Sequence, residues 1–408
     1  MTVAALPSTW RQTTLGEVAA PVPNAIVDGP FGSNLKTSDY VEEGVPVLQG
    51  KNITNDSFRW FDVRFISERK AAELKRSSVR VGDILVIKIG SIGYSAIVKD
   101  LNGFEFAIIP ANLAKVTPDA SKIDLGYLHK WLTSVDAKRY LNSVASKTAQ
   151  PALSLGKIKG LPLPLPPLAE QRRITEVLDR AEALRAKRRA ALAELDSLTQ
   201  SLFLDHFGDP VSNPKGWPMK PFGEICDTRL GKMLDQKQQT GQHLRPYLRN
   251  ASVQWFRFEL ADIFEMDFDE KARKLFRLKD GDLIICEGGE PGRAAVWRGE
   301  IEECYYQKAL HRARPRIDLA IAEFLAWQLW FLAHRGGLGD HVTSATIAHL
   351  TGEKLNAMKI PLPPISLQRE FARRVTAVEA LKTAQCASLA ELDALFATLQ
   401  HRAFRGEL

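Results

Sequence analysis

The sequence predicts an α+β protein in which two similar globular domains alternate with two long helices that form an antiparallel coiled coil. Three observations carry this prediction. The segment PLPPLAEQR at 164–172 recurs as PLPPISLQR at 361–369. The segment GDILVIKIGSIGYSAIV at 82–98 has a counterpart, GDLIICEGGEPGRAAVW, at 281–297. After each proline-rich segment the hydrophobic period becomes helical. Two similar halves of about 200 residues make a pseudo-twofold internal repeat, which suits a partner that itself has two parts.

Proline-rich segments divide the chain into alternating globular and helical parts. The predicted domains are 1–163, 164–212, 213–360 and 361–408, of which the second and fourth are the helical regions. The globular parts alternate short β-rich runs with glycine-containing turns. Each closes with an amphipathic helical stretch, at 125–141 in the first and 319–333 in the second. The prolines themselves are expected to act as rigid hinges that start each long helix.

The helical parts carry the pattern of a coiled-coil seam, with core positions at alternating steps of three and four residues. The predicted apolar seam positions are Ile174, Val177, Ala181, Leu184, Leu195, Leu198 and Leu202 in the first helix, and Phe371, Val378, Leu381, Leu392, Leu395 and Leu399 in the second. Arg188 and Gln385 occupy the same polar step in the two copies, where a polar residue can fix the register of pairing. Because the first helix leads to the second domain and the second helix returns, the pair is expected to be antiparallel.

Composition is that of an ordinary globular protein, with 45% hydrophobic and 25% charged residues among 408. The net charge of +7 favours an anionic partner. The N-terminus lacks the pattern of a signal peptide, and no run of 18 apolar residues is present. The cysteines are Cys226, Cys286, Cys304 and Cys386, none of them in a CxxC pair, as expected for reduced thiols of a cytoplasmic protein.

A rigid spacer between two basic modules predicts recognition of a DNA site in two parts. Contacts are expected from loops where polar or basic side chains stand beside glycine, since glycine permits close backbone approach. In the first domain the candidates are Ser33, Asn34, Lys36, Gln49, Lys51, Asn52, Lys88, Ser91 and Tyr94. In the second domain they are Arg229, Lys232, Gln236, Arg245, Arg249, Asn250 and Arg293. For each of these alone, an ordinary solvated side chain remains the alternative.

The loops 88–94 and 287–293 support the set of candidates because they follow equivalent strands. The residues differ, with Lys88 in one copy against Glu287 in the other, as two readers of unlike half-sites require. The run RAKRR at 185–189 is either a phosphate-contacting segment or a solvated face of the coil.

Taken together, these segments resemble the specificity subunit of type I restriction-modification systems. The resemblance rests on the doubled PLPPxxxQR and LAELD helices and on the bridge FGDPVSNPKGWP at 207–218. The loop GPFGSNLK at 29–36 is also similar to this family, whereas the second half has RLGKMLDQ at 229–236 in its place. The difference implies that the two halves read different base sequences.

The resemblance implies a subunit without chemistry of its own, which binds an asymmetric, bipartite DNA sequence. It further implies two adenine methyltransferase subunits as partners, joined in the restricting complex by motor–nuclease restriction subunits. S-adenosylmethionine, ATP and Mg²⁺ would then belong to those partners, with no cofactor or metal held by this chain and no membrane as a partner.

Two rival interpretations come from other functional classes. A stand-alone DNA methyltransferase or nuclease would need motifs that the sequence lacks, since it has neither a GxxxxGK[ST] loop nor an Asn-Pro-Pro-aromatic tetrapeptide. His334, His341 and His349 lack the spacing of a zinc site. A purely structural coiled-coil scaffold leaves two different basic domains unexplained. The base sequence that is recognised does not follow from the chain.

Overall fold

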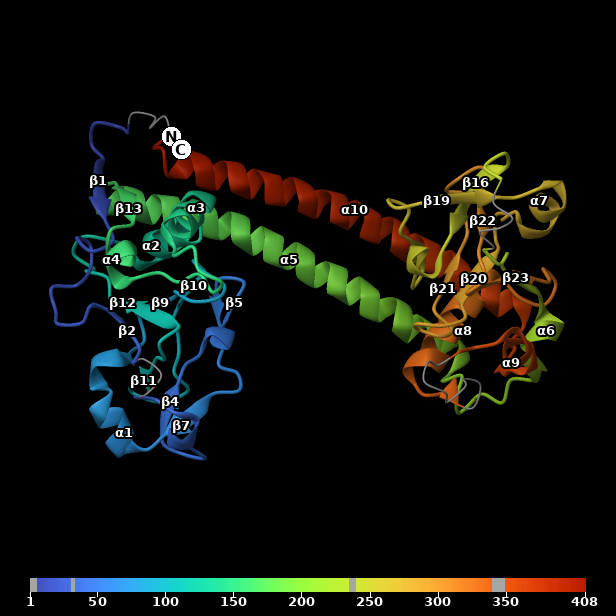
Figure 1. Cartoon of the computed structure of the whole chain (residues 1–408), viewed down its shortest axis with the longest axis horizontal. Helices are drawn as coiled ribbons and strands as arrows, with labels where there is room; N and C mark the ends of the chain where they lie inside the picture. The colour runs from blue at the N-terminus through green and yellow to red at the C-terminus, as the bar shows by residue number, and fades with distance from the viewer. Residues whose placement is uncertain (1–5, 31–33, 235–239, 340–348) are drawn as a thin grey trace. The chain divides into compact units, whose positions relative to one another are not determined.

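The computed structural model describes residues 6–30, 34–234, 240–339 and 349–408, and the chain forms two compact units. Unit 1 comprises Met1–Arg189 and Ala387–Leu408, and unit 2 comprises Ala190–Cys386. Each unit therefore contains one globular domain together with a segment of each long helix. Figure 1 shows the order of the elements along the chain.

Unit 1 is built on two small sheets and short helices. Its strands are β1 Arg11–Thr14, β2 Ile26–Asp28, β3 Tyr40–Val41, β4 Val45–Val47, β5 Ile53–Thr54, β6 Ser57–Phe58, β7 Arg64–Ile66, β8 Ser78–Val79, β9 Ile84–Ile87, β10 Ser95–Ile97, β11 Ala107–Ile108, β12 Leu113–Val116 and β13 Pro162–Leu165. Its helices are α1 Glu68–Glu73, α2 Leu125–Leu132, α3 Val135–Val144 and α4 Leu155–Lys159. The central sheet has the order β10-β9-β12-β2, and a second sheet has the order β3-β7-β4-β11-β8.

Strand β9 is the centre of unit 1 because all four of its residues, Ile84–Ile87, are buried. A continuous run of β-branched and aliphatic residues suits a strand covered on both faces. The helical stretch predicted at 125–141 is present but is divided into α2 and α3. Thr133 ends the first helix, and Ser134 caps the second, since its hydroxyl accepts a hydrogen bond from the Ala137 N–H at 3.2 Å.

Unit 2 repeats this plan with its own bounds. Its strands are β14 Met219–Pro221, β15 Cys226–Leu230, β16 Leu244–Leu248, β17 Val253–Gln254, β18 Arg257–Phe258, β19 Phe264–Asp267, β20 Leu283–Cys286, β21 Ala294–Val296, β22 Tyr305–Tyr306, β23 Leu310–Pro315 and β24 Lys359–Pro361. Its helices are α6 Phe222–Ile225, α7 Glu270–Phe276, α8 Ala322–His334 and α9 Gly352–Ala357. The central sheet, β15-β23-β20-β21, matches that of unit 1 strand for strand.

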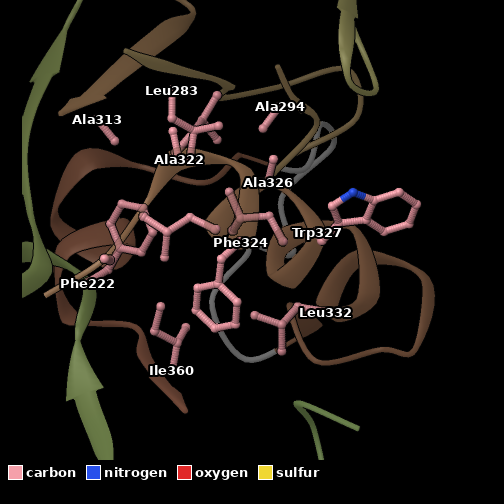
Figure 2. Packing of buried hydrophobic residues seen from close by; sticks show 14 of the residues in the cluster. Phe222, Leu283, Ala294, Ala313, Ala322, Phe324, Ala326, Trp327, Leu332 and Ile360 are labelled. Atoms are coloured by element: carbon pink, nitrogen blue, oxygen red, sulfur yellow. The ribbon is translucent and has the colours of Figure 1, made fainter. Parts of the chain in front are cut away.

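Helix α8 forms the core of unit 2 and fulfils the prediction of a helix at 319–333. It is apolar on nearly all sides, as expected of a helix packed between other elements. Figure 2 shows its residues Phe324 and Trp327 among Leu283 of the sheet and Ile360 of β24. The core is thus shared by sheet, helix and the strand that leads into the second long helix.

The two long helices are α5 Leu168–Phe207 and α10 Ile365–Ala403, as the helical period predicted. They run antiparallel within each unit. In unit 1, Arg173 donates to the Leu408 carbonyl at 2.9 Å, and Arg185 pairs with Asp393 at 2.6 Å.

The same direction holds in unit 2, where Lys382 pairs with Asp196 at 2.8 Å and Phe203 contacts Phe371. Arg185–Asp393 and Lys382–Asp196 are equivalent pairs of the internal repeat, so the pseudo-twofold relation extends to individual ion pairs.

Alternate positions of the predicted seam are buried or half-buried, whereas at most of the positions between them the next residue along the chain is the more buried one. Ile174, Phe371 and Val378 are buried, and Ala181, Leu195, Leu202, Leu392 and Leu399 are half-buried. Leu184, Leu198, Leu381 and Leu395 were predicted wrongly and are 55, 43, 52 and 51% exposed. Val177 is only half-buried, and its neighbour Leu178 is fully buried in its place.

The displacement has a physical cause in the long polar side chains. Arg185 and Lys382 occupy the positions predicted for Leu184 and Leu381, since their aliphatic stems can cover the partner helix while the charged ends reach an aspartate. The Arg185 guanidinium also lies 4.3 Å from the centroid of the Phe396 ring. A seam whose positions are spaced by three and then four residues has the same average period as one spaced by four and then three. The sequence alone therefore does not distinguish the two sets of seam positions.

The motif PLPPxxxQ occurs once in each half of the chain, and its glutamine is buried in both copies. Gln171 donates to the carbonyls of Pro166 at 2.8 Å and Lys122 at 3.1 Å, and its side-chain oxygen accepts from the Asp124 N–H at 2.7 Å. Gln368 makes the equivalent three bonds, to Pro363, Leu319 and Ile321. Both side chains are fully buried, so each glutamine fastens the start of a long helix to the preceding domain.

The prolines were predicted to be hinges, and part of each group lies in a strand instead. Pro162–Leu165 forms β13, which pairs with β1, and Lys359–Pro361 forms β24, which pairs with β14. Proline is tolerated in such two-stranded edges because the missing N–H faces away from the ladder.

Candidate nucleic-acid interface

One edge of the central sheet in unit 1 gathers most of the candidate loops. Asp28 at the end of β2 pairs with Ala114, and Ile87 at the end of β9 pairs with Leu113. The loop that follows β2, the loop between β9 and β10, and the turn that precedes β12 therefore leave the sheet side by side. Loops at one edge of a rigid sheet are a common place for binding residues.

The corresponding edge of unit 2 is built in the same way. Leu230 of β15 pairs with His311, and Cys286 of β20 pairs with Leu310. Gly29 and Gly231 hold the same place in the two units, because a Cβ there would lie 2.1 Å from the Ile109 carbonyl oxygen and 2.2 Å from that of Gln307. Glycine is therefore required at the point where each loop crosses the opposing turn.

The candidates in unit 1 divide into exposed residues and buried ones. Asn34, Lys36, Ser91 and Tyr94 are exposed, whereas Gln49 and Lys51 are half-buried; Ser33 lies outside the described residues. Lys51 forms an ion pair with Asp62. The exposed residues on loops of the sheet edge keep side chains available for a partner, and their role as DNA contacts stays a prediction.

Lys88 and Asn52 have a geometry that does not suit direct contact with DNA. Lys88 is 4% exposed, and its ammonium group lies 2.5 Å from a carboxylate oxygen of Asp28. Asn52 is fully buried, and its amide donates to the carbonyls of Arg59 at 3.1 Å and Phe61 at 2.7 Å. Both residues hold loops in position. A polar residue beside glycine has the same sequence pattern whether it reads DNA or supports a loop.

The ion pair Asp28–Lys88 ties together the two loops that the sequence singled out. Asp28 directly precedes the glycine-proline turn at 29–30, and Lys88 begins the loop 88–94. The Ser77 hydroxyl donates to the Asp28 carbonyl at 2.9 Å, and the Lys88 N–H donates to the Asn112 carbonyl at 2.9 Å. A buried pair of opposite charges joined to several segments fixes their relative geometry.

Most of the candidates in unit 2 are bonded to other groups of the same unit. Arg245 pairs with Glu303 at 3.1 Å, Arg249 pairs with Asp262 at 2.7 Å, and the Lys232 ammonium donates to the Asp267 carbonyl. Arg229, on β15, is exposed, and Gln236 lies outside the described residues. Surface ion pairs of this kind stabilise little and can exchange for phosphate contacts.

Arg293 and Asn250 form a closed network in unit 2. The Arg293 guanidinium donates to Glu290 at 3.1 Å and to the Asn250 carbonyl at 3.2 Å, and the Asn250 amide donates to the Gly288 carbonyl at 3.0 Å. The Arg293 side chain is only 15% exposed. These two candidates therefore support the loop 287–293.

The run 185–189 on α5 is likewise engaged within unit 1. Arg185 and Arg189 both pair with Asp393, at 2.6 and 3.1 Å. The charged face of the coil is thus partly neutralised by the partner helix.

Sequence reasoning missed the polar side chains at the turn before β12 and at the tip of the β5–β6 hairpin. Asn112 and Asn55 both line a cavity beside β9. Asn55 adopts a positive φ of 49°, typical of asparagine in a tight hairpin turn. The sequence offered a signal for the hairpin, in the dipeptide Asn55-Asp56, but none for the position of Asn112.

Burial favours the neutral forms of three cysteine thiols and of one histidine. Burial raises the pKa of the Cys226 and Cys304 thiols to about 12 and that of Cys286 to about 11, so all three stay protonated. Burial lowers the pKa of His311, whose ring nitrogen Nε2 lies 3.0 Å from the Leu350 carbonyl oxygen.

Among the residues that the structure describes, no group of three or more His, Cys, Asp or Glu side chains is placed to hold a metal ion. A search of the same residues finds no helix long and apolar enough to cross a membrane.

The chain matches the family described as "Type I restriction modification DNA specificity domain" over residues 7–194 and 214–392. It is 28% identical to the type I restriction enzyme EcoBI specificity subunit of Escherichia coli over 207 residues, which cover 50% of this chain and 42% of that protein. It is 22% identical to the EcoKI specificity subunit of Escherichia coli strain K12, over 100% of this chain and 91% of that protein.

A solved structure described as the "structural basis underlying complex assembly and conformational transition of the type I R-M system" shares the fold. Its TM-score is 0.64 at 21% identity, over 99% of this chain and 100% of that one. The family matches lie on both halves of the chain, in agreement with the internal repeat.

Proposed function

Because this chain belongs to the type I restriction-modification DNA specificity family, we propose that each unit reads one half of a bipartite DNA site through the loops at the edge of its central sheet. The observation that carries this proposal is the pair of equivalent edges with unlike side chains. On the loop that follows the equivalent strands β9 and β20, unit 1 carries Ser91 and Tyr94 where unit 2 carries Glu290 and Arg293. Two similar frameworks that carry different side chains at the proposed DNA-binding edge suit the recognition of two different half-sites.

The second part of the proposal is that the paired helices bind two adenine methyltransferase subunits, one at each unit. Support comes from the leucines that the coil leaves exposed, Leu184 and Leu395 in unit 1 and Leu198 and Leu381 in unit 2. Each unit carries one such leucine from each helix, and the internal repeat relates the two pairs. Repeated exposed leucines on a helical face are typical of a protein-binding surface.

The third part concerns chemistry and location. The chain is proposed to act without catalysis of its own, in the cytoplasm, with S-adenosylmethionine, ATP and Mg²⁺ bound by the methyltransferase and motor–nuclease restriction subunits. Support for this assignment comes from the sequence, which has neither a GxxxxGK[ST] loop nor an Asn-Pro-Pro-aromatic tetrapeptide. The rival proposal, a stand-alone methyltransferase or nuclease, is tested by incubating the purified chain alone with DNA and each cofactor.

The decisive experiment is selection of bound duplexes from a random library by the full chain. The expected result is one motif made of two short, different half-sites separated by a spacer of fixed length. Selection of a single continuous motif, or of no motif at all, would contradict the proposal. Native mass measurement of the complex with the methyltransferase subunit tests the stoichiometry, for which two copies per chain are expected.

A further inference from the structure

Unit 1 contains an open cavity of about 440 Å³ at the candidate interface, within the range of roughly 300–1,000 Å³ usual for ligand sites. It lies between the end of β9, the β5–β6 hairpin and the turn before β12. Ile53 and Ile87, both nearly fully buried, form its apolar part. The cavity therefore combines a rigid apolar floor with the loops that leave the sheet edge.

Four polar side chains around the cavity have polar atoms without a hydrogen bond among the described residues, and the Tyr94 ring lies 4.3 Å from the Lys138 ammonium group. Asn55, Ser91, Tyr94 and Asn112 all line it. In the described part of the chain, these four side chains have no hydrogen-bond partner, either within the hairpin and loops or elsewhere. Polar groups that converge on a cavity without internal partners are available to a ligand.

The equivalent place in unit 2 is closed. Backbone bonds define the equivalence, since the Lys88 N–H donates to the Asn112 carbonyl and the Glu287 N–H donates to that of Ala309, both at 2.9 Å. Asn112 therefore corresponds to Ala309, which has no polar side chain.

The other three polar positions of the cavity correspond to Trp255, Glu290 and Arg293, which bind one another. The Trp255 indole N–H donates to Glu290 at 2.5 Å, and the Arg293 guanidinium donates to Glu290 at 3.1 Å. The side chains of unit 2 that correspond to the polar rim of the cavity are thus bonded to one another.

Asn112 is the best-placed of the four to read a base. Its backbone carbonyl is fixed by Lys88, which is itself held by the buried pair with Asp28. Its carboxamide lies against Gly50, where a Cβ would come within 3.1 Å of the amide nitrogen Nδ2. A side chain with a fixed backbone and free polar atoms has the preorganisation that base recognition needs.

We propose that Asn112 is a specificity-determining residue of unit 1, which receives the edge of an adenine at the open cavity. A carboxamide presents a donor and an acceptor side by side, the complement of adenine N6 and N7 in the major groove. Ser91 and Tyr94 line the same cavity and complete its polar rim. The inference rests on the proposed function, since it assigns one base of the half-site that unit 1 reads.

The test is the same library selection, applied to Asn112→Ala and Asn112→Asp in the full chain. With Ala, the preference for adenine at one position of one half-site is expected to fall by about 5- to 150-fold, with the other half-site unchanged. With Asp, an acceptor without a donor, the preference at that position is expected to move toward cytosine. Circular dichroism and the melting temperature of each variant establish that the chain is folded.

A matched pair of variants tests the cavity itself. The double variant Ser91→Glu with Tyr94→Arg places the glutamate and arginine of unit 2 at the cavity of unit 1 and is expected to weaken the base preference in the half-site that unit 1 reads. Ala309→Asn in unit 2 is expected to leave the base preference of that half-site unchanged. Unaltered base preferences in folded Asn112→Ala would overturn the inference. If the unaltered chain itself selects no two-part motif, the proposed function fails instead, so the two failures are distinct.

Discussion

Unit 1 and unit 2 share their framework and differ at the edge where DNA is proposed to bind. The framework is repeated bond for bond, as in Gln171 and Gln368, each of which is fully buried and fastens a long helix. The edges differ in their charged groups and in the open volume beside them. Unit 1 has the buried Asp28–Lys88 ion pair next to an open cavity, whereas unit 2 has the Glu290–Arg293 ion pair at the corresponding loop. The buried glutamines are thus the same in both units, whereas the side chains at this edge of the sheet differ.

This contrast teaches how one duplicated fold can read two sequences. The buried glutamines and the interhelical ion pairs recur in both units and keep the two frameworks equivalent. The loops at the sheet edge are anchored at the same backbone positions in both units, so their side chains can change without loss of the fold. Each prediction below alters one side of this contrast.

The largest effect is expected from exchange of a whole domain. Replacing residues 213–357 with the matching segment of a relative should change one half-site completely and leave the other intact, because the units have separate cores. Library selection with the chimaera measures this. A change in both half-sites would mean that the two edges do not read independently.

A large effect on stability is expected from breaking the buried ion pair in unit 1. Lys88→Met removes the cation that is bonded to the buried Asp28 carboxylate and leaves only the more exposed Arg76, at 3.8 Å, which should lower the free energy of unfolding by up to about 3–5 kcal/mol. Adding Asp28→Leu, the residue of unit 2 at this place, should restore most of the loss. Denaturant unfolding of the single and double variants gives both values.

Glu287→Gln serves as the control in unit 2, where the change should stay within about 0.5 kcal/mol. A double variant as unstable as the single one would show that Asp28 is needed for more than its charge.

A smaller, symmetrical effect is expected from the helix-anchoring glutamines. Gln171→Ala and Gln368→Ala each remove three hydrogen bonds and leave buried backbone groups unpaired, at a cost of about 2–3 kcal/mol. The exposed Gln150→Ala should have no measurable effect. Thermal unfolding compares the stability of the three variants. Unequal losses of stability at Gln171 and Gln368 would show that the two glutamines do not have equivalent roles in the two units.

The smallest effect on the fold is expected from the exposed leucines. Leu184→Ser with Leu395→Ser in unit 1, or Leu198→Ser with Leu381→Ser in unit 2, should change the stability of the free chain by less than about 0.5 kcal/mol. Each pair should instead weaken the binding of one methyltransferase subunit, measured by titration and native mass. Loss of neither copy from either double variant would place the partner surface elsewhere.

The sequence by itself determined the architecture. The doubled motifs predicted the internal repeat, the helical period predicted α5 and α10, and short apolar runs predicted the central strands. These features depend on local patterns, since periods of two and of about 3.6 residues are properties of neighbouring positions along the chain. The sequence also shows that the equivalent loops 88–94 and 287–293 carry unlike residues, and their role as readers of DNA stays a prediction.

Tertiary structure alone decided which of the patterned residues face inward. The seam runs through Leu178 and Arg185 in place of Val177 and Leu184, because Asp393 on the other helix attracts the arginine. Lys88 is buried because Asp28, far away in the sequence, lies opposite it across the sheet edge. Asn112 borders an open cavity only because neighbouring loops leave that space unfilled. Each of these outcomes depends on partners brought together by folding, and a single sequence does not encode those distances locally.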